Sequence, residues 1–357
     1  MFLASTEFAQ KTDEAFWWIT GIMMFFLVGI TFTMIYFVWK YGRKKHPKAS
    51  QIHGNTKLEI TWIVIPTLIV LFMFWKGYEG FALMRRVPPG AMEIEVEARQ
   101  WAWSFHYPKA DITTTELYVP AGVPVKLLLT TPIDDVIHSF YLPEFRVKED
   151  CVPGMVNHLW FQGDEKHIEG SPYPIFCAEY CGTDHSRMYT SVHFLSKEDF
   201  AAWMEKEVAQ RYRPIEIDAA MDPSSPDIVG CGAADLYATY CVSCHGKGGE
   251  GGMVEGARSF QSLADWKRGP SIPDMFVTLT EGLEGTQMRS FANLSAWDRF
   301  ALAWHVAGLY EGTDRPNGER ADFERVIKQY ELDVQQDIPR PLDIEGTIEE
   351  MVEPADG

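Results

Sequence analysis

FCAEYCGTDHSRM, residues 176–188, places two cysteines, a histidine and a methionine close together in the middle of this chain. Cys177, Cys181, His185 and Met188 lie within twelve residues of one another. Soft sulfur ligands combined with imidazole select copper. Two cysteines separated by three residues can bridge two metal ions, so that one electron is shared between them. Such sharing suits an electron relay better than substrate chemistry.

A second imidazole for this site is available upstream, in DVIHSF, residues 135–140. His138 follows an expected strand and precedes a loop, where a metal ligand would project. Two alternatives remain open at this point. Cys177 and Cys181 could bind zinc together with His185, or they could form a disulfide in an oxidising compartment.

The residues before this site alternate with a period of two. In Met92–Ala98, apolar Ile94 and Val96 alternate with glutamates, and a similar alternation runs through 123–129. Such alternation predicts half-buried strands. Pro and Gly separate these short runs, and no helical crossover pattern lies between them. We therefore expect a β-sandwich or barrel of roughly 120 residues.

Two long apolar runs precede the strands. Residues 16–39 contain 24 consecutive uncharged residues, which as a helix would span roughly 36 Å, enough to cross a bilayer. Residues 60–75 are uncharged as well, and the run continues toward residue 83. We expect a hairpin of membrane helices over about 16–39 and 59–83. The connecting loop is rich in lysine and arginine, so the positive-inside rule places it in the cytoplasm, and both termini and everything after about residue 85 on the periplasmic side.

The two histidine and cysteine segments, together with the helix hairpin, resemble cytochrome c oxidase subunit II over residues 15–200. In that family a dinuclear copper A centre lies in a cupredoxin sandwich. The resemblance implies that two cysteines bridge the coppers, that two histidines are terminal ligands, that a methionine is a weak ligand, and that a glutamate offers its backbone carbonyl. These are Cys177, Cys181, His138, His185, Met188 and Glu179. The side chain of that glutamate also meets magnesium at the border with subunit I in the family.

Two further positions match the family. QWAWS, residues 100–104, resembles the aromatic strand where electrons enter from cytochrome c, which maps to Trp101; core packing is the alternative role. Ala102 replaces the usual aromatic residue, which suggests a changed docking surface for a tethered donor. Glu59 matches a glutamate at the mouth of a proton path, although an acid at a helix start is also favoured by the helix dipole. Met155 replaces the arginine that usually follows Pro-Gly, so the contact of that arginine with subunit I is in doubt.

CVSCH, residues 241–245, is the attachment motif for c-type haem. Cys241 and Cys244 would bind the haem vinyl groups, and His245 would be an axial ligand of the iron. A redox-active dithiol is the alternative, but no parallel-sheet pattern surrounds the motif. Residues 234–240 are expected to form the helix before it, and 295–309 a closing helix.

A sixth ligand of the iron should lie downstream. Met288 in GTQMRSF, residues 285–291, resembles the methionine loop of class I cytochromes c, although Arg289 replaces the usual proline. The rival ligands are Met253, Met275 and His305. We expect Met288 because methionine and histidine are the usual pair in cytochromes c.

Composition agrees with a modular membrane protein. The chain has 357 residues and a formal charge of −18, which excludes nucleic acid as a partner and suits a basic protein partner. We expect a multidomain membrane protein with a helix hairpin, an all-β cupredoxin sandwich and an all-α cytochrome c domain. The expected boundaries are 1–90 for the hairpin, 91–212 for the sandwich, 213–228 for a linker, 229–313 for the cytochrome domain and 314–357 for an irregular acidic tail.

Together these features predict the electron-accepting subunit of a terminal oxidase in the inner membrane, with haem c, two coppers and a magnesium ion at the border with subunit I. Electrons from cytochrome c or a quinol-oxidising complex would pass through haem c and copper A to subunit I, which reduces oxygen and translocates protons. A copper A subunit of a nitric oxide reductase, a tethered electron carrier without a catalytic partner and a copper-delivering assembly factor are the alternatives.

Overall fold

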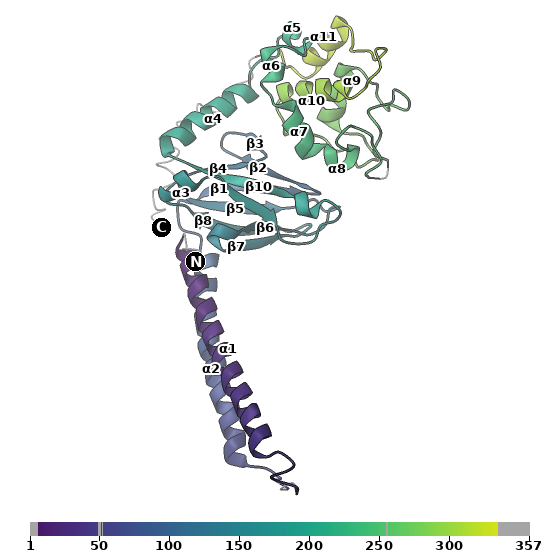
Figure 1. The fold of residues 1–357 in the computed structure, drawn as a ribbon. Coiled ribbons are helices and arrows are strands. Elements are labelled where there is room, and N and C mark those ends of the chain that lie inside the picture. The colour runs from purple at the N-terminus through teal and green to yellow at the C-terminus, as the bar shows by residue number, and fades with distance from the viewer. Residues whose placement is uncertain (1–5, 49–50, 52, 255, 335–357) are drawn as a thin grey trace. The chain divides into compact units, whose positions relative to one another are not determined.

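The computed structural model describes residues 6–48, 51, 53–254 and 256–334, and it divides into two compact units (Figure 1). One unit comprises the chain up to Val87 together with Pro143–Val147, and the other comprises the remainder. The predicted fold class is confirmed: two long apolar helices precede a β-sandwich, and a helical region follows it.

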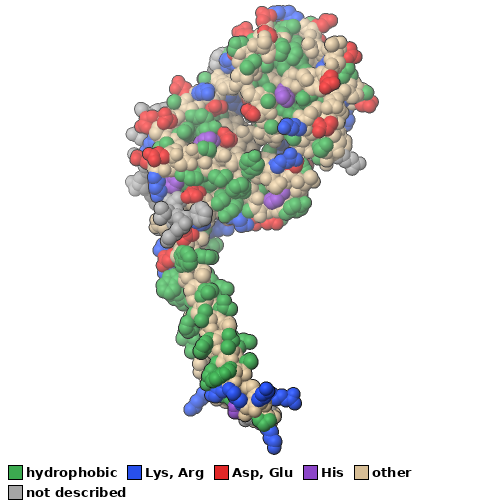
Figure 2. Space-filling view, in the orientation of Figure 1, with side chains coloured by type: hydrophobic (Ala, Val, Ile, Leu, Met, Phe, Trp, Pro, Cys, Tyr) green, Lys and Arg blue, Asp and Glu red, His purple; other side chains and the backbone are tan. Residues whose placement is uncertain are grey.

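The first unit is a hairpin of α1 (Glu7–Lys40) and α2 (Thr56–Arg85). The helices contact each other through the rings of Trp18 and Phe72, 5.5 Å apart, and through an ion pair between Glu14 and Lys76 at 3.5 Å. Phe8 and Ala9 at the start of α1 are buried, whereas most apolar side chains farther along both helices are exposed, and basic residues gather at the turn (Figure 2). Both helices are long and apolar enough to cross a membrane, and this outward apolar surface is what a bilayer requires.

Both helices are longer than the expected 16–39 and 59–83. α1 begins at Glu7 because Thr6 caps it by accepting a hydrogen bond from the Ala9 amide at 3.2 Å. The expected start at residue 16 rested on the uncharged run alone, so it did not include this polar first turn. Pro66 lies inside α2 without ending it.

The second unit contains two five-stranded sheets with the strand orders β3-β2-β1-β5-β8 and β4-β10-β9-β6-β7. The strands are β1 (Met92–Arg99), β2 (Ala102–Tyr107), β3 (Ile112–Thr114), β4 (Leu117–Pro120), β5 (Pro124–Thr130), β6 (His138–Leu142), β7 (Val147–Cys151), β8 (Asn157–Gln162), β9 (Tyr173–Cys177) and β10 (Tyr189–Leu195). β1 and β5 pair in parallel, and their inward residues, such as Ile94 and Leu127, are completely buried. The expected alternation in these two strands is confirmed.

A helical region follows the sandwich. It contains α4 (Lys197–Arg211), α5 (Ile217–Ala220), α6 (Pro226–Val229), α7 (Ala233–Tyr240), α8 (Val242–His245), α9 (Ile272–Glu281), α10 (Ala296–Gly308) and α11 (Arg320–Gln329). α3 (Lys166–Gly170) lies between β8 and β9. Stacked rings of Phe276, Phe300 and Phe323 join α9, α10 and α11.

Two segments differ from their expected roles. The proposed linker contains α5 and α6, and Ala220 and Ile228 are buried in the helical core. The segment expected to be an irregular tail begins with α11, whose residues Phe323 and Val326 are buried in the same core. Apolar residues at helical spacing, rather than the net acidity, decide the structure there. The remainder of the expected tail, 335–357, lies outside the described residues.

Candidate metal centre

The predicted ligands meet because β6 pairs with β9. In this antiparallel pair Phe140 lies opposite Cys177, which brings His138 at the start of β6 next to the end of β9. The loop after β9 carries Cys181, and a short 3-10 turn presents His185. Gly182 adopts a positive φ of 117°, and a Cβ there would meet the Trp101 ring at 3.1 Å, so a larger residue at 182 would be strained.

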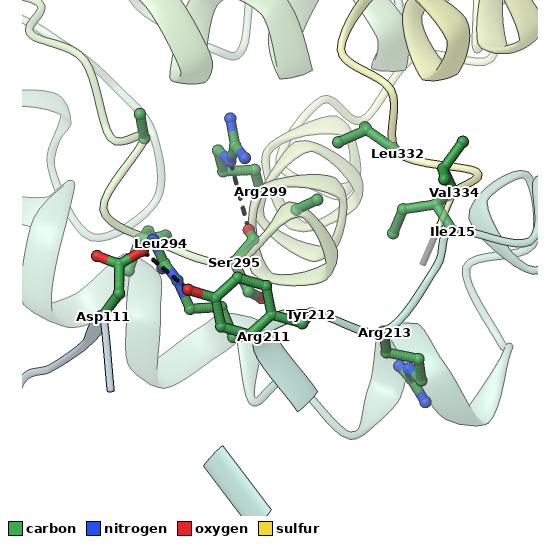
Figure 3. Close-up of a pocket in the computed structure, with 12 residues that line it drawn as sticks. Asp111, Arg211, Tyr212, Arg213, Ile215, Leu294, Ser295, Arg299, Leu332 and Val334 are labelled. Atoms are coloured by element: carbon green, nitrogen blue, oxygen red, sulfur yellow. Dashed lines mark hydrogen bonds and ion pairs between the residues drawn. The ribbon is translucent and has the colours of Figure 1, made fainter. Parts of the chain in front are cut away.

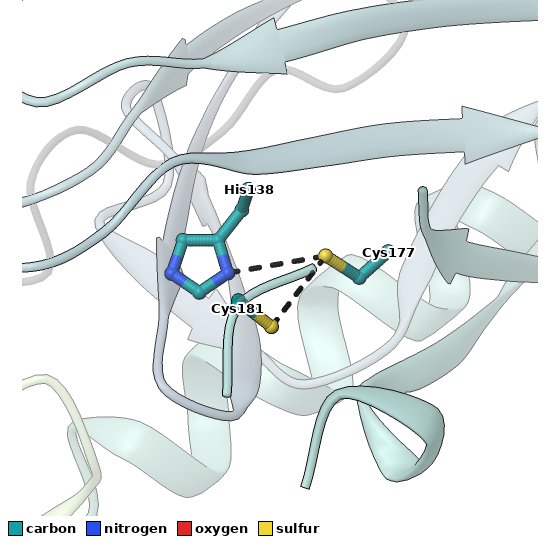
Figure 4. Close-up of side chains that lie close together, drawn as sticks. All are labelled: His138, Cys177 and Cys181. Carbon is teal, nitrogen blue, oxygen red and sulfur yellow. Dashed lines mark hydrogen bonds between the residues drawn. The ribbon is translucent and has the colours of Figure 1, made fainter. Parts of the chain in front are cut away.

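Three of the predicted ligands form a compact cluster (Figure 4). The Cys177 and Cys181 Sγ atoms lie 3.8 Å apart, and the Cys177 Sγ lies 3.9 Å from His138 Nδ1. All three side chains are buried. A disulfide requires sulfurs about 2.05 Å apart, so the structure places these cysteines together as free thiols.

The other three expected donors surround the same sulfurs. The Glu179 carbonyl oxygen lies 3.2 Å from Cys177 Sγ. His185 Nδ1 lies 3.5 Å and Met188 Sδ 3.7 Å from Cys181 Sγ. The two sulfurs and the four donors around them make six, which exceeds what a single tetrahedral zinc ion uses. The soft donor set therefore fits two bridged coppers better than one zinc.

The two sulfurs differ in their proton affinity. Their mutual hydrogen bond lowers the pKa of Cys177 to about 3, and the same interaction raises the pKa of Cys181. Metals bind cysteine as the thiolate, so metal binding at this pair must displace any proton that the sulfurs still hold.

A carboxylate that sequence reasoning did not assign orients the first histidine. Burial opposes ionisation of Asp135, but hydrogen bonds from the His138 ring and from the backbone amides of Val136 and Gln100 outweigh it and lower the pKa of Asp135. His138 Nε2 lies 3.3 Å from Asp135 Oδ1, and Nδ1 is the nitrogen that faces the sulfurs. Carboxylates often fix the ring of a ligand histidine in this way. The available signal was an acid three residues before the histidine.

Trp101 is connected directly to the cluster. Its indole Nε1 donates to the Cys181 carbonyl oxygen at 3.0 Å, and Gln100 Nε2 donates to the same oxygen at 2.7 Å. Trp103, two residues later, is buried and packs against Phe140 with ring centroids 5.7 Å apart. The two tryptophans therefore have different environments, and the half-buried one touches the loop that carries the ligands.

The cysteine–histidine motif of the helical region spans α8. His245 Nδ1 donates to the Arg258 carbonyl oxygen at 3.0 Å, which leaves Nε2 free to bind a metal. Burial is the main cause that lowers the pKa of His245, which favours the neutral ring that a ligand needs. The Phe260 ring stacks on it at 4.2 Å. These residues fit a haem held through Cys241 and Cys244.

The candidate sixth ligands differ in their surroundings. Met288 is half-buried against the helical core, and its carbonyl accepts from the Leu283 amide at 2.8 Å. Met253 is 57% exposed. The Met275 sulfur accepts a hydrogen bond from Arg315 at 3.0 Å, and His305 packs on the Tyr237 ring at 4.9 Å. Of the four candidates, Met288 is thus the one that is partly buried while its sulfur makes no hydrogen bond among the described residues.

Glu59 lies in the first turn of α2, where its side chain accepts from the Asn55 amide at 3.3 Å. Asn55 in turn accepts from the Leu58 amide at 3.2 Å. This reciprocal arrangement caps the helix. The cap alone is a sufficient reason for an acid at this position. The role of Glu59 in a proton path remains a prediction.

Known proteins resemble this chain in its membrane helices and in its β-sandwich. Residues 112–195 match the profile of the cytochrome c oxidase subunit II periplasmic domain, and residues 2–76 match that of its transmembrane domain. Cytochrome c oxidase subunit 2 of Alkalihalophilus pseudofirmus is 30% identical over 263 residues, which cover 69% of this chain and 72% of that protein. Alternative cytochrome c oxidase subunit 2 of Bradyrhizobium diazoefficiens is 31% identical and covers 56% of this chain and 80% of its own length. The crystal structure of the periplasmic domain of subunit II of cytochrome oxidase of Bradyrhizobium japonicum is 29% identical, covers 34% of this chain and 96% of its own, and gives a TM-score of 0.32.

The chain is thus a two-pass membrane protein whose β-sandwich carries a cysteine–histidine metal centre. It belongs to the cytochrome c oxidase subunit II family. Membership implies copper A at this centre and association with subunit I of a haem–copper oxidase, where the catalytic step takes place.

Proposed function

We propose that this chain receives electrons at a covalently bound haem c and delivers them through copper A to subunit I of an oxygen-reducing, proton-translocating oxidase. The convergence of four further donors on the two free cysteine sulfurs carries the copper part of this proposal. His138, Cys177, Glu179, Cys181, His185 and Met188 would hold the metal. Copper A, when bound, supplies a one-electron carrier that needs little rearrangement on reduction. The exposed Glu179 side chain would be a magnesium ligand at the border with subunit I.

The haem part rests on the helical region. Cys241 and Cys244 would attach the haem, and His245 and Met288 would be its axial ligands. His245 is held by the Arg258 carbonyl, which orients the ring and fixes its proton on Nδ1. We take residues 229–313 as a cytochrome c domain, with α11 packed against it.

Contacts between the helical core and the sandwich support a tethered donor. Ala102, beside Trp101, packs against the helical core. Arg289, directly after Met288, forms an ion pair with Glu97 of β1 at 3.6 Å. Burial and the nearby Arg99 lower the pKa of Arg289, and Glu97 opposes this change. The proposed sixth-ligand loop thus contacts the strand that leads to Trp101, so a donor within the same chain accounts for the small residue at 102.

The basic loop between α1 and α2 supports an orientation with the loop in the cytoplasm. Lys40, Arg43, Lys44 and Lys45 lie in or next to this turn. Both redox domains would then face the periplasm, an oxidising setting in which haem attachment and copper loading are possible.

Purification of the tagged full chain from membranes in mild detergent tests the function. We expect two coppers and one covalent haem for each chain, and co-purification with a large polytopic haem protein that consumes oxygen. A partner that reduces nitric oxide but not oxygen would instead show that this chain is the copper A subunit of a nitric oxide reductase. Recovery of the chain without any catalytic partner would establish a tethered carrier.

Trp101→Leu should slow electron transfer from haem c to copper A, because it removes the indole that touches the Cys181 carbonyl. We expect a decrease of about tenfold or more, which corresponds to about 1.4 kcal/mol in the barrier. Flash-induced absorbance changes of the full chain measure this rate. Trp103→Phe is the matched control: it should lower thermal stability but preserve the rate. Equal electron-transfer rates in the two variants would show that Trp101 does not lie on the path from haem c to copper A.

A further inference from the structure

A cavity of about 110 Å³ lies among the end of α4, the residue before β3 and the start of α10, and none of the residues that line it is a proposed copper or haem ligand (Figure 3). Its polar lining includes Arg211, Arg213, Arg299 and a single acid, Asp111. Three arginines around one cavity are unexpected in a chain with a formal charge of −18. The cavity therefore concentrates positive charge in an acidic protein.

Arg299 is the most deeply placed of these arginines, with a side chain only 8% exposed. Its Nε donates to the Ser295 carbonyl at 3.4 Å, its Nη1 donates to Thr280 Oγ1, and its guanidinium lies over the Phe276 ring. Among the described residues, its Nη2 has no hydrogen bond and its charge has no ion pair. The adjacent carboxylate of Asp298 is engaged in the capping box with Ser295. The negative charge of Asp298 partly compensates the charge of Arg299, but the two side chains form no direct ion pair among the described residues, so a bound anion would add a closer counter-charge to a buried guanidinium.

Arg211 lies on the opposite side of the same cavity. Its Nη1 donates to the Asn293 carbonyl at 2.8 Å, and its Nη2 is 3.9 Å from Asp111, which also accepts from Tyr212 at 2.8 Å. Asp111 therefore neutralises Arg211 only in part. Arg213 differs, since it is paired with Asp227 and stacked over Trp297. Burial and repulsion by Arg211 lower the pKa of Arg299 to about 10, and the negative charge of Asp298 opposes this decrease.

The start of α10 adds backbone donors to the lining. Ser295 and Ala296 line the cavity, and α10 is 13 residues long. The capping box already uses the amides of Ser295 and Asp298, so the amides of Ala296 and Trp297 are the ones at this helix start that lack an intrahelical acceptor. The helix dipole favours an anion at this end. Two guanidinium groups and a helix N-terminus together provide the donors that recognise a tetrahedral oxyanion.

We propose that this cavity binds inorganic phosphate, held by Arg299, Arg211 and the first amides of α10. A water molecule occupies roughly 30 Å³ in the liquid, so a cavity of about 110 Å³ has room for a phosphate ion. The bound anion would join the end of α4 to α10, and it would supply a close counter-charge for Arg299. None of the proposed copper or haem ligands takes part, so the site is independent of the proposed function.

Calorimetric titration of the detergent-solubilised full chain with phosphate, at constant ionic strength, tests this site. We expect one saturable site for each chain, and a rise in the unfolding temperature with phosphate. Arg211→Gln and Arg299→Leu should each weaken binding by about tenfold or more, as the loss of a charge-assisted contact implies. Arg325→Gln, on the exposed side of α11, makes the same change in charge and should bind like the original chain.

Arg211→Gln decides the outcome if Arg299→Leu fails to fold, because Arg211 is partly exposed. No saturable binding at millimolar phosphate would overturn the proposal. Equal affinities for Arg211→Gln and Arg325→Gln would overturn it too, because they would show a general attraction of anions to the surface.

Discussion

Cys181→Ser should abolish the copper A centre while the covalent haem is preserved. The Cys181 sulfur lies 3.8 Å from Cys177 Sγ, 3.5 Å from His185 Nδ1 and 3.7 Å from Met188 Sδ, so it connects both sides of the donor set. A serine hydroxyl is a hard, neutral donor at pH 7 and cannot replace a thiolate that bridges soft ions. We expect copper affinity to fall by more than about 100-fold, above the loss typical of outer-shell partners.

Metal content and electron spin resonance of the purified full chain measure this effect. The mixed-valence signal should disappear, whereas the ratio of haem to protein stays constant. Cys231→Ser is the matched control, because Cys231 lies in the helical region and hydrogen-bonds to the Asp227 carbonyl at 3.1 Å and to the side chain of Asp298, as a hydroxyl can also do. A Cys181→Ser protein that keeps both coppers and an unchanged signal would contradict the assignment of the bridge.

The ligand residues could be found from sequence because most of them lie in one short segment. Cys177, Cys181, His185 and Met188 are separated by a few residues, so their order and chemistry alone indicate a site. His138 required a pairing between β6 and β9 that sequence does not show, and here the family resemblance supplied the information. The strands around them were predicted because burial of one face imposes alternation.

The supporting contacts could not be predicted because they join residues far apart in the chain. The Gln100 side chain donates to the Cys181 carbonyl, which is 81 positions away in the sequence, and the Gln100 backbone amide donates to Asp135. Arg299 gains its importance from a cavity that includes Arg211, on another helix. Such contacts depend on the packing of separate elements, which local periodicity does not encode.

The misjudged tail has a different physical cause. We expected the region after residue 313 to be irregular because it is acidic and lacks a long apolar run. α11 nevertheless buries Phe323, Val326 and Ile327, which lie three to four residues apart on one face. A short amphipathic helix can keep many charges on its other face. Net charge is therefore a poor guide when the apolar positions are few but regularly spaced.

Met288→Ala should leave haem c attached but remove its sixth ligand. Cys241 and Cys244 would still hold the haem, so its quantity should not change, whereas a thioether ligand that raises the reduction potential would be lost. We expect the midpoint potential to fall by on the order of 0.1 V, well within the range that axial ligands control. Redox titration of the full chain, followed by visible absorbance, measures the shift. The lower potential should also slow reduction of the haem by an external donor.

The rival methionines provide matched controls for this result. Met253→Ala removes an exposed side chain, and Met275→Leu preserves the volume of a buried one while it removes the sulfur that Arg315 contacts. Both variants should retain the original potential if Met288 is the ligand. If the midpoint potential shifts in Met275→Leu but not in Met288→Ala, Met275 of α9 is the ligand. It would also turn Arg315 into a residue that competes with iron for the same sulfur. An unchanged potential in all three variants would leave His305 as the sixth ligand, and bis-histidine ligation would then be visible in the absorbance spectrum of the original chain.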